Sequence, residues 1–120
     1  MPCACGEGAE SRLIYACSGA ANTGLLADQV MRALNRDKVG DSTCLAAMGA
    51  ELSGFLVSAR SATLNIVLDG CKVGCGAKVF EKNSIAFRQL IMTDYDVVKG
   101  KTAITGELIE AVTKRIAAEL

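Results

Sequence analysis

The sequence predicts an α/β domain built on a four-stranded parallel sheet. Short apolar runs, several of them β-branched, alternate with segments whose apolar residues recur every three to four positions. This alternation favours right-handed crossovers that place helices on both faces, which gives a three-layer architecture. We expect the strand order 2-1-3-4, with the switch point between the first and third strands.

The first strand and helix are predicted between residues 13 and 34. Leu13–Cys17 is short, apolar and typical of a buried strand. A loop of small residues, Ser18–Gly24, follows it, and Asn22 or Thr23 is a candidate cap for the next helix. The apolar face of that helix is formed by Leu26, Val30, Ala33 and Leu34.

The second and third units follow the same plan. Asp41–Ala46 is predicted as a strand, and its polar start suggests a sheet edge. An amphipathic helix is expected from Ser53. Asn65–Leu68 is a buried strand that stops at the turn signal Asp69-Gly70, and a third helix follows Gly76.

The last unit begins with the predicted strand Phe87–Met92. Val97–Ile104 contains glycine and lysine and is expected to form a loop. Thr105 is then the predicted cap of a final amphipathic helix.

Composition and charge exclude several classes of partner. Thirteen Lys and Arg residues balance thirteen Asp and Glu residues, so nothing favours nucleic acid or an anionic membrane. No apolar run approaches the roughly 20 residues of a membrane span, and the first ten residues do not resemble a signal peptide. We therefore expect a cytoplasmic protein, and the sequence identifies no protein partner.

The two ends of the chain differ in character. Residues 12–120 are expected to form one domain, because this length is sufficient for a hydrophobic core. Residues 1–11 lack periodicity and are predicted to form a flexible tail that carries Cys3 and Cys5. Two thiols this close in sequence can bind one metal ion, and the tail is long enough to reach the sheet edge. The alternative interpretation is an ordinary flexible terminus.

Cysteine is the residue type that carries the predicted chemistry. The chain has six cysteines and no histidine, and cytoplasmic thiols stay reduced, so they indicate metal or redox chemistry. Four of them lie at, near or just after the ends of predicted strands, and parallel strands all end at one edge of their sheet. Four converging thiolates satisfy tetrahedral zinc. The candidate ligands are Cys17, Cys44, Cys71 and Cys75.

Two other functions remain open from the residues alone. Cys71 lies before a predicted helix, whose amino terminus stabilises thiolate, so it is a candidate nucleophile of a thiol redox or sulfur-transfer enzyme. Cys75 or Cys17 would then be the resolving thiol. The third possibility is a small-molecule binder of the flavodoxin type that uses Ser18–Gly24. The sequence therefore leaves both an enzyme and a binding protein open.

The loop after Cys17 also invites comparison with low-molecular-weight phosphatases and arsenate reductases. In those proteins a cysteine opens the loop and an arginine closes it. Here no arginine lies between Cys17 and Arg32. Backbone N–H groups alone would then bind an oxyanion, with no cation to make two hydrogen bonds to it. This disfavours the interpretation.

Four short motifs resemble the DGC family of bacterial and archaeal proteins. They are Asp69-Gly70-Cys71, Tyr15–Ala20, Thr43–Ala46 and Thr93-Asp94, and the resemblance spans about residues 12–118. The family is described as zinc-binding, with no reaction attached. The resemblance implies a zinc site formed by Cys17, Cys44, Cys71 and Cys75.

The chain departs from the family pattern around the last two cysteines. Proline and an Asn-Cys-Ala sequence are common there, whereas this chain has Lys72 and Gly74-Cys75-Gly76. Both sulfurs are retained, but the loop is expected to be looser, which bears on metal affinity.

Overall fold

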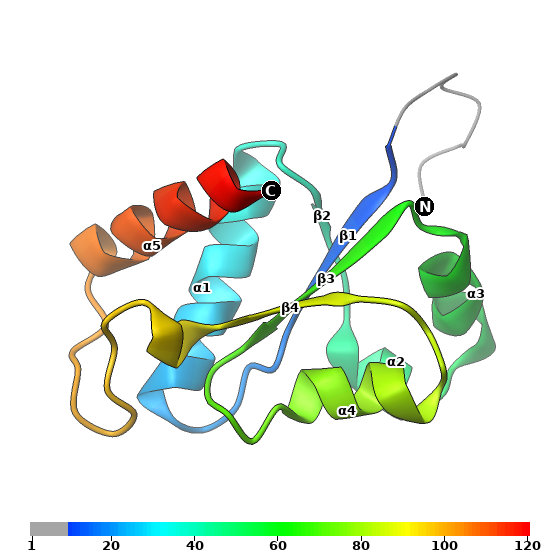
Figure 1. Cartoon of the computed structure of the whole chain (residues 1–120), viewed down its shortest axis with the longest axis horizontal. Coiled ribbons are helices and arrows are strands. Elements are labelled where there is room, and N and C mark those ends of the chain that lie inside the picture. The colour runs from blue at the N-terminus through cyan, green and yellow to red at the C-terminus, as the bar shows by residue number, and fades with distance from the viewer. Residues whose placement is uncertain (1–9) are drawn as a thin grey trace.

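A computed structural model describes residues 10–120 as an α/β domain (Figure 1). Its sheet is parallel and has the order β2-β1-β3-β4, so the predicted fold class and strand order are confirmed. The elements are β1 (Arg12–Ala16), α1 (Asn22–Arg36), β2 (Asp41–Ser42), α2 (Leu45–Gly49), α3 (Ser53–Ser61), β3 (Leu64–Asp69), α4 (Cys75–Lys82), β4 (Arg88–Ile91), a 3-10 turn η1 (Met92–Asp94) and α5 (Gly106–Glu119).

The alternation of side chains along β1 creates two hydrophobic cores. Ile14 and Ala16 face a core that includes buried residues of α1 and α5. Leu13 and Tyr15 face the opposite core, where Met48 and others from α2–α4 pack. Helices therefore cover both faces of the sheet, as the sequence predicted.

The second strand is shorter than predicted. The sequence suggested Asp41–Ala46, but β2 pairs with β1 only through Asp41 and Ser42, and Cys44 immediately precedes α2. The Leu45–Gly49 segment, rich in alanine, leucine and methionine, favours helix over strand, which explains the early change. Cys44 still lies at the carboxyl edge, because β2 runs parallel to β1.

The predicted helix caps have mixed outcomes. Thr105 caps α5 as expected, because its Oγ1 accepts a hydrogen bond of 3.1 Å from the Leu108 amide. The prediction that Asn22 or Thr23 caps α1 is wrong. Ala21 holds the cap position without a side-chain hydrogen bond, and Asn22 is the first helical residue. Its amide group is used elsewhere, as described below.

Two glycines allow the loops at the carboxyl edge to pack tightly. A Cβ on Gly24 would lie 2.5 Å from backbone atoms of Gly19. A Cβ on Gly70 would lie 2.8 Å from the backbone of Thr23. The loop after β3 therefore packs directly on the first turn of α1, with no room for a side chain between them.

The proposed tail falls mostly outside the described residues, which include only Glu10 and Ser11 of its eleven positions. Cys3 and Cys5 are among the residues outside, so their part in the site stays a prediction. Across residues 10–120, no helix combines the length and apolar character that a membrane span requires.

Gly24→Ala should lower the free energy of unfolding by about 1–3 kcal/mol, because the new methyl group would overlap backbone rather than a movable side chain. Gly54→Ala in α3 is the matched control, since no atom lies within 4 Å of its Cβ position. That variant should be neutral or more stable by up to about 1 kcal/mol. Urea denaturation measures both, and equal stabilities would contradict the close approach.

Candidate functional site

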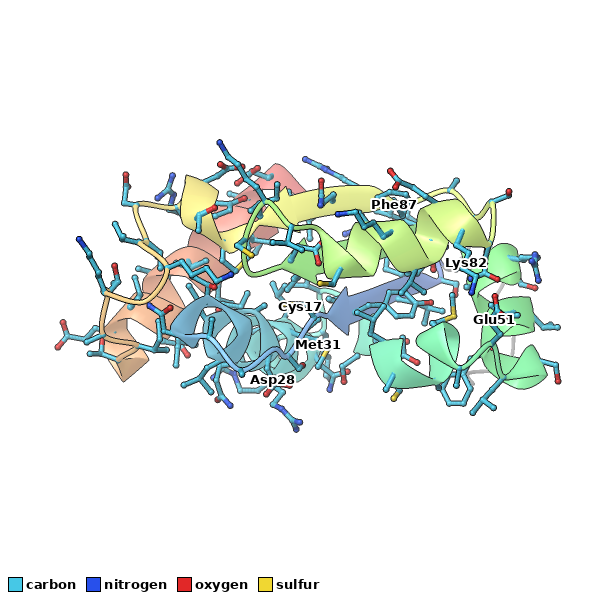
Figure 2. All side chains as sticks on the ribbon, turned by 90° about the horizontal axis from the view of Figure 1, so that it is seen from below. Cys17, Asp28, Met31, Glu51, Lys82 and Phe87 are labelled. Carbon is cyan, nitrogen blue, oxygen red and sulfur yellow. The ribbon has the colours of Figure 1, made fainter. Side chains whose placement is uncertain are left out.

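The four candidate cysteines lie at the carboxyl edge of the sheet, on three different loops. Figure 2 views this edge from below and labels Cys17 at the end of β1. Cys71 follows β3, and both thiols are half-buried. Cys44 precedes α2, Cys75 begins α4, and both are exposed. The loops that carry the four cysteines therefore share one edge of the sheet, as the topology predicted.

Cys17 ties the ends of the two central strands together. Its amide donates to the Leu68 carbonyl at 3.0 Å, which extends the β1–β3 ladder by one residue. Its Sγ accepts a hydrogen bond of 3.2 Å from the Gly70 amide. The sulfur of Cys17 thus contacts the residue next to Cys71, and the two half-buried thiols belong to adjoining backbone segments.

Asp69 positions the loop that carries Cys71 and Cys75. Its carboxylate is buried and accepts hydrogen bonds from the Gly76 amide at 2.7 Å and the Ala77 amide at 3.1 Å. Gln89 of β4 donates a third bond at 2.8 Å. The first free amides of α4 are therefore satisfied by a carboxylate from β3, which also suits the positive end of the helix dipole.

The sequence identified Asp69 only as a turn signal and missed this role. Gly76 makes the arrangement possible, because a Cβ there would lie 2.5 Å from Val67 Cγ1 and 2.9 Å from Asp69 Oδ1. The available signal was an aspartate at the end of a strand, followed seven residues later by a glycine in the first turn of a helix.

Lys99 contacts the thiol of Cys71. Its ammonium nitrogen lies 3.4 Å from Cys71 Sγ, although the two residues are far apart in sequence. The backbone N–H of Val73 lowers the pKa of the Cys71 thiol below its usual value, and Lys99 lowers it further. Partial desolvation and the charge of Asp69 oppose this shift. Cys71 is thus the thiol whose surroundings favour the anion.

Asn22 holds the loop that presents Lys99. Its side-chain amide donates to the carbonyls of Val98 at 3.1 Å and Thr102 at 2.8 Å. Its Oδ1 accepts a bond of 2.7 Å from the Gly100 amide. All the hydrogen-bonding atoms of one side chain therefore fix the turn around Lys99. Sequence reasoning assigned this segment only as a loop, because nothing local indicates that it folds back onto α1.

The exposed cysteines lie on neighbouring segments. Leu45 follows Cys44, and Gly76 follows Cys75. The Cδ2 atom of Leu45 lies 3.4 Å from the position that a Cβ on Gly76 would occupy. The α2 and α4 segments are also linked by an ion pair of 3.7 Å between Lys82 and Glu51, whose side chains face each other in Figure 2.

The thiols suit a soft divalent metal, but their present spacing does not form a ligand set. Within residues 10–120, no three side chains of Cys, His, Asp or Glu are grouped so that they could hold a metal ion. The donor type nevertheless suits zinc, and all four thiols come from loops at the same edge of the sheet. The four-cysteine site remains a prediction from the sequence.

Comparison with known proteins places the chain in a family. A family model described as the DGC domain matches residues 13–116. The chain belongs to the DGC domain family. This DGC domain contains all four candidate cysteines and Lys99 within the matched region.

A curated relative is the anaerobic and virulence modulator AnvM of Pseudomonas aeruginosa. It is 35% identical over 63 residues, which cover 52% of this chain and 48% of AnvM. The chain thus spans about half the length of the curated relative that it matches. No solved structure matches this DGC domain.

Asp69→Asn should destabilise the domain by about 1–3 kcal/mol, because an NH2 group would face at least one buried N–H donor. Asp96→Asn makes the same change of charge at an exposed carboxylate, which pairs with Arg115 at 3.3 Å, and should cost under about 1 kcal/mol. Thermal unfolding distinguishes them. If the two variants lost equal stability, the role assigned to Asp69 would be wrong.

The lowered pKa of Cys71 predicts the pH dependence of its alkylation. In metal-free protein, its reaction with iodoacetamide should reach half its maximal rate at a pH below the usual thiol pKa of 9.0, because the thiolate is the reacting form. Lys99→Met should raise this midpoint, whereas Lys101→Met, in the same loop, should leave it in place. Mass spectrometry of the alkylated peptide gives the rate, and equal midpoints in both variants would contradict the contact.

Proposed function

We propose that this DGC domain binds zinc through Cys17, Cys44, Cys71 and Cys75. The observation that carries the proposal is the topology, which brings four thiols from three loops to one edge of a parallel sheet. With no histidine in the chain, thiolates are the soft donors available. The resemblance to the DGC family implies the same four ligands.

The arrangement of the thiols in two pairs suggests how a site would assemble. Cys17 and Cys71 belong to segments already joined through Gly70, and Cys44 and Cys75 flank the contact between α2 and α4. Zinc binding would require the exposed Cys44 and Cys75 to move toward the half-buried Cys17 and Cys71. Four thiolates on one Zn²⁺ leave a net charge of −2, and the ammonium of Lys99 would offset part of it.

Sensing, storage or transfer of the metal suits this site at least as well as a scaffolding role. Cys44 and Cys75 are exposed, and glycines flank Cys75 on both sides, so ligand exchange would not require the core to open. A zinc site of four cysteines is usually structural, but exposed ligands in loops can be exchanged for another thiolate or a substrate. AnvM is named as a modulator, and a response to metal or thiol state is consistent with such a role in this chain.

A second candidate function is thiol chemistry at Cys71, favoured by the contacts of its Sγ with the Val73 amide and Lys99. In thiol–disulfide exchange, the Cys71 thiolate would attack a substrate disulfide and expel one substrate thiolate. Cys17 or Cys75 would then displace the second substrate thiolate and form a protein disulfide. The flavodoxin-type alternative has less support, because Ser18 and Asn22 are engaged within the protein.

Metal analysis separates the two leading functions. Anaerobically purified protein should contain zinc, and each of Cys17→Ser, Cys44→Ser, Cys71→Ser and Cys75→Ser should lower its metal content, because a thiolate ligand is removed. Thr43→Ser, beside Cys44, is a control that should retain zinc. Iodoacetamide should react slowly with the wild-type protein until a chelator is added.

Rapid alkylation of Cys71 alone, unchanged by the chelator, would instead support the thiol enzyme. Full zinc content in all four serine variants would exclude the proposed ligand set. Circular dichroism should accompany each measurement, so that loss of metal is distinguished from loss of the fold.

A further inference from the structure

A cavity of about 550 Å³ lies at the carboxyl edge, between α1 and the start of α2. Its walls come from the ends of β1 and β2, from α1, and from Phe55 of α3. Asp28 and Met31 of α1, both labelled in Figure 2, are among the residues that line it. Of the four candidate cysteines, Cys44 is the one that lines it. Its volume is in the range of small-molecule sites.

Arg32 lines the cavity with a guanidinium that is paired with Asp28, and its side chain is 66% exposed. Its Nε donates to Asp28 Oδ2 at 2.8 Å, one turn earlier on α1. The other oxygen of Asp28 accepts a hydrogen bond of 3.0 Å from Ser18 Oγ. The carboxylate is thus engaged on both sides. Among residues 10–120, the two terminal nitrogens of Arg32 donate to no protein group, so they are available to a ligand.

The loop after β1 is held in an unusual conformation to complete this arrangement. Ser18 has a φ of 49°, in the left-handed region that residues other than glycine rarely adopt. Its hydroxyl is thereby held against Asp28, which in turn orients Arg32. Such backbone conformations persist where the surrounding structure imposes them.

The remaining walls define the chemistry of the occupant. Met31 and Phe55 provide an apolar surface, and Phe55 is 37% exposed although it is aromatic. Ser42 and Thr43 also line the cavity. An anionic group would pair with the Arg32 guanidinium in a forked geometry, while an apolar body would cover the phenyl ring. An inorganic oxyanion would leave the apolar wall uncovered.

We propose that this cavity binds a small organic carboxylate with an apolar body, with the carboxylate on Arg32 and the body against Met31 and Phe55. No arginine follows Cys17 closely in the sequence, as it does in the phosphatase loop. The fold instead brings Arg32 of α1 into the lining of the same cavity as Cys44. The proposal does not depend on zinc, because none of its contacts uses a metal ligand.

Benzoate is a suitable probe, with benzyl alcohol as its uncharged counterpart. Both should be titrated into the metal-free full chain with a chelator present, and backbone amide NMR shifts should be followed. Benzoate should move the signals of Met31, Thr43 and Cys44 in a saturable manner, and benzyl alcohol should bind more weakly. Bound benzoate should also slow the alkylation of Cys44 by iodoacetamide. Cys75 lies outside the cavity, so its alkylation serves as an internal control.

Arg32→Gln should weaken benzoate binding about tenfold or more, because it removes the charged donor. Arg36→Gln makes the same change one turn later, where the guanidinium pairs with Asp37 and Glu110, and should leave binding unchanged. Arg32→Lys keeps the charge without the fork and should give an intermediate affinity. The NMR spectra also report whether each variant is folded.

Equal binding of benzoate and benzyl alcohol would overturn the proposal. So would equal weakening by Arg32→Gln and Arg36→Gln, or the absence of saturable shifts around the cavity. None of these results would bear on zinc, since the chelator is present throughout.

Discussion

The carboxyl edge of this domain depends on one buried carboxylate. Asp69 ends β3, and its two oxygens accept bonds from the first turn of α4 and from Gln89 of β4. A buried carboxylate is costly unless each oxygen has donors, so the start of α4 must return to meet it. The intervening loop, Gly70–Gly74, joins the end of β3 to the start of α4 and carries the half-buried Cys71.

The end of β1 lies between two groups of chemically active side chains. On one side, Cys17 contacts Gly70, and the adjoining Cys71 contacts Lys99. On the other side, Ser18 begins the hydrogen-bonded chain that orients Arg32. Consecutive residues thus serve both groups.

The sequence predicted most of the fold because its signals are local. Apolar runs and helical periodicity located the main elements, and the parallel topology then placed Cys17 and Cys71 at one edge. The extent of β2 was wrong because helix propensity after Cys44 outweighed a short polar strand. Lys99 was not predicted beside Cys71, since this contact is set by tertiary packing. Arg32 pairs locally with Asp28, but its place in the cavity wall is set by the packing of α1 near the ends of β1 and β2. The distances between the four cysteine sulfurs could not be predicted either, because they depend on the conformation of the loops.

The side-chain amide of Asn22 joins segments that are 76 to 80 residues apart in the chain. Contacts across such separations cost loop-closure entropy before any bond is gained, so they depend on the sheet that brings the segments together. The setting of Lys99 beside Cys71 is therefore a property of the whole domain and not of the local sequence. A fragment without α1 would carry this thiol without the three hydrogen bonds that hold the turn around its cationic neighbour.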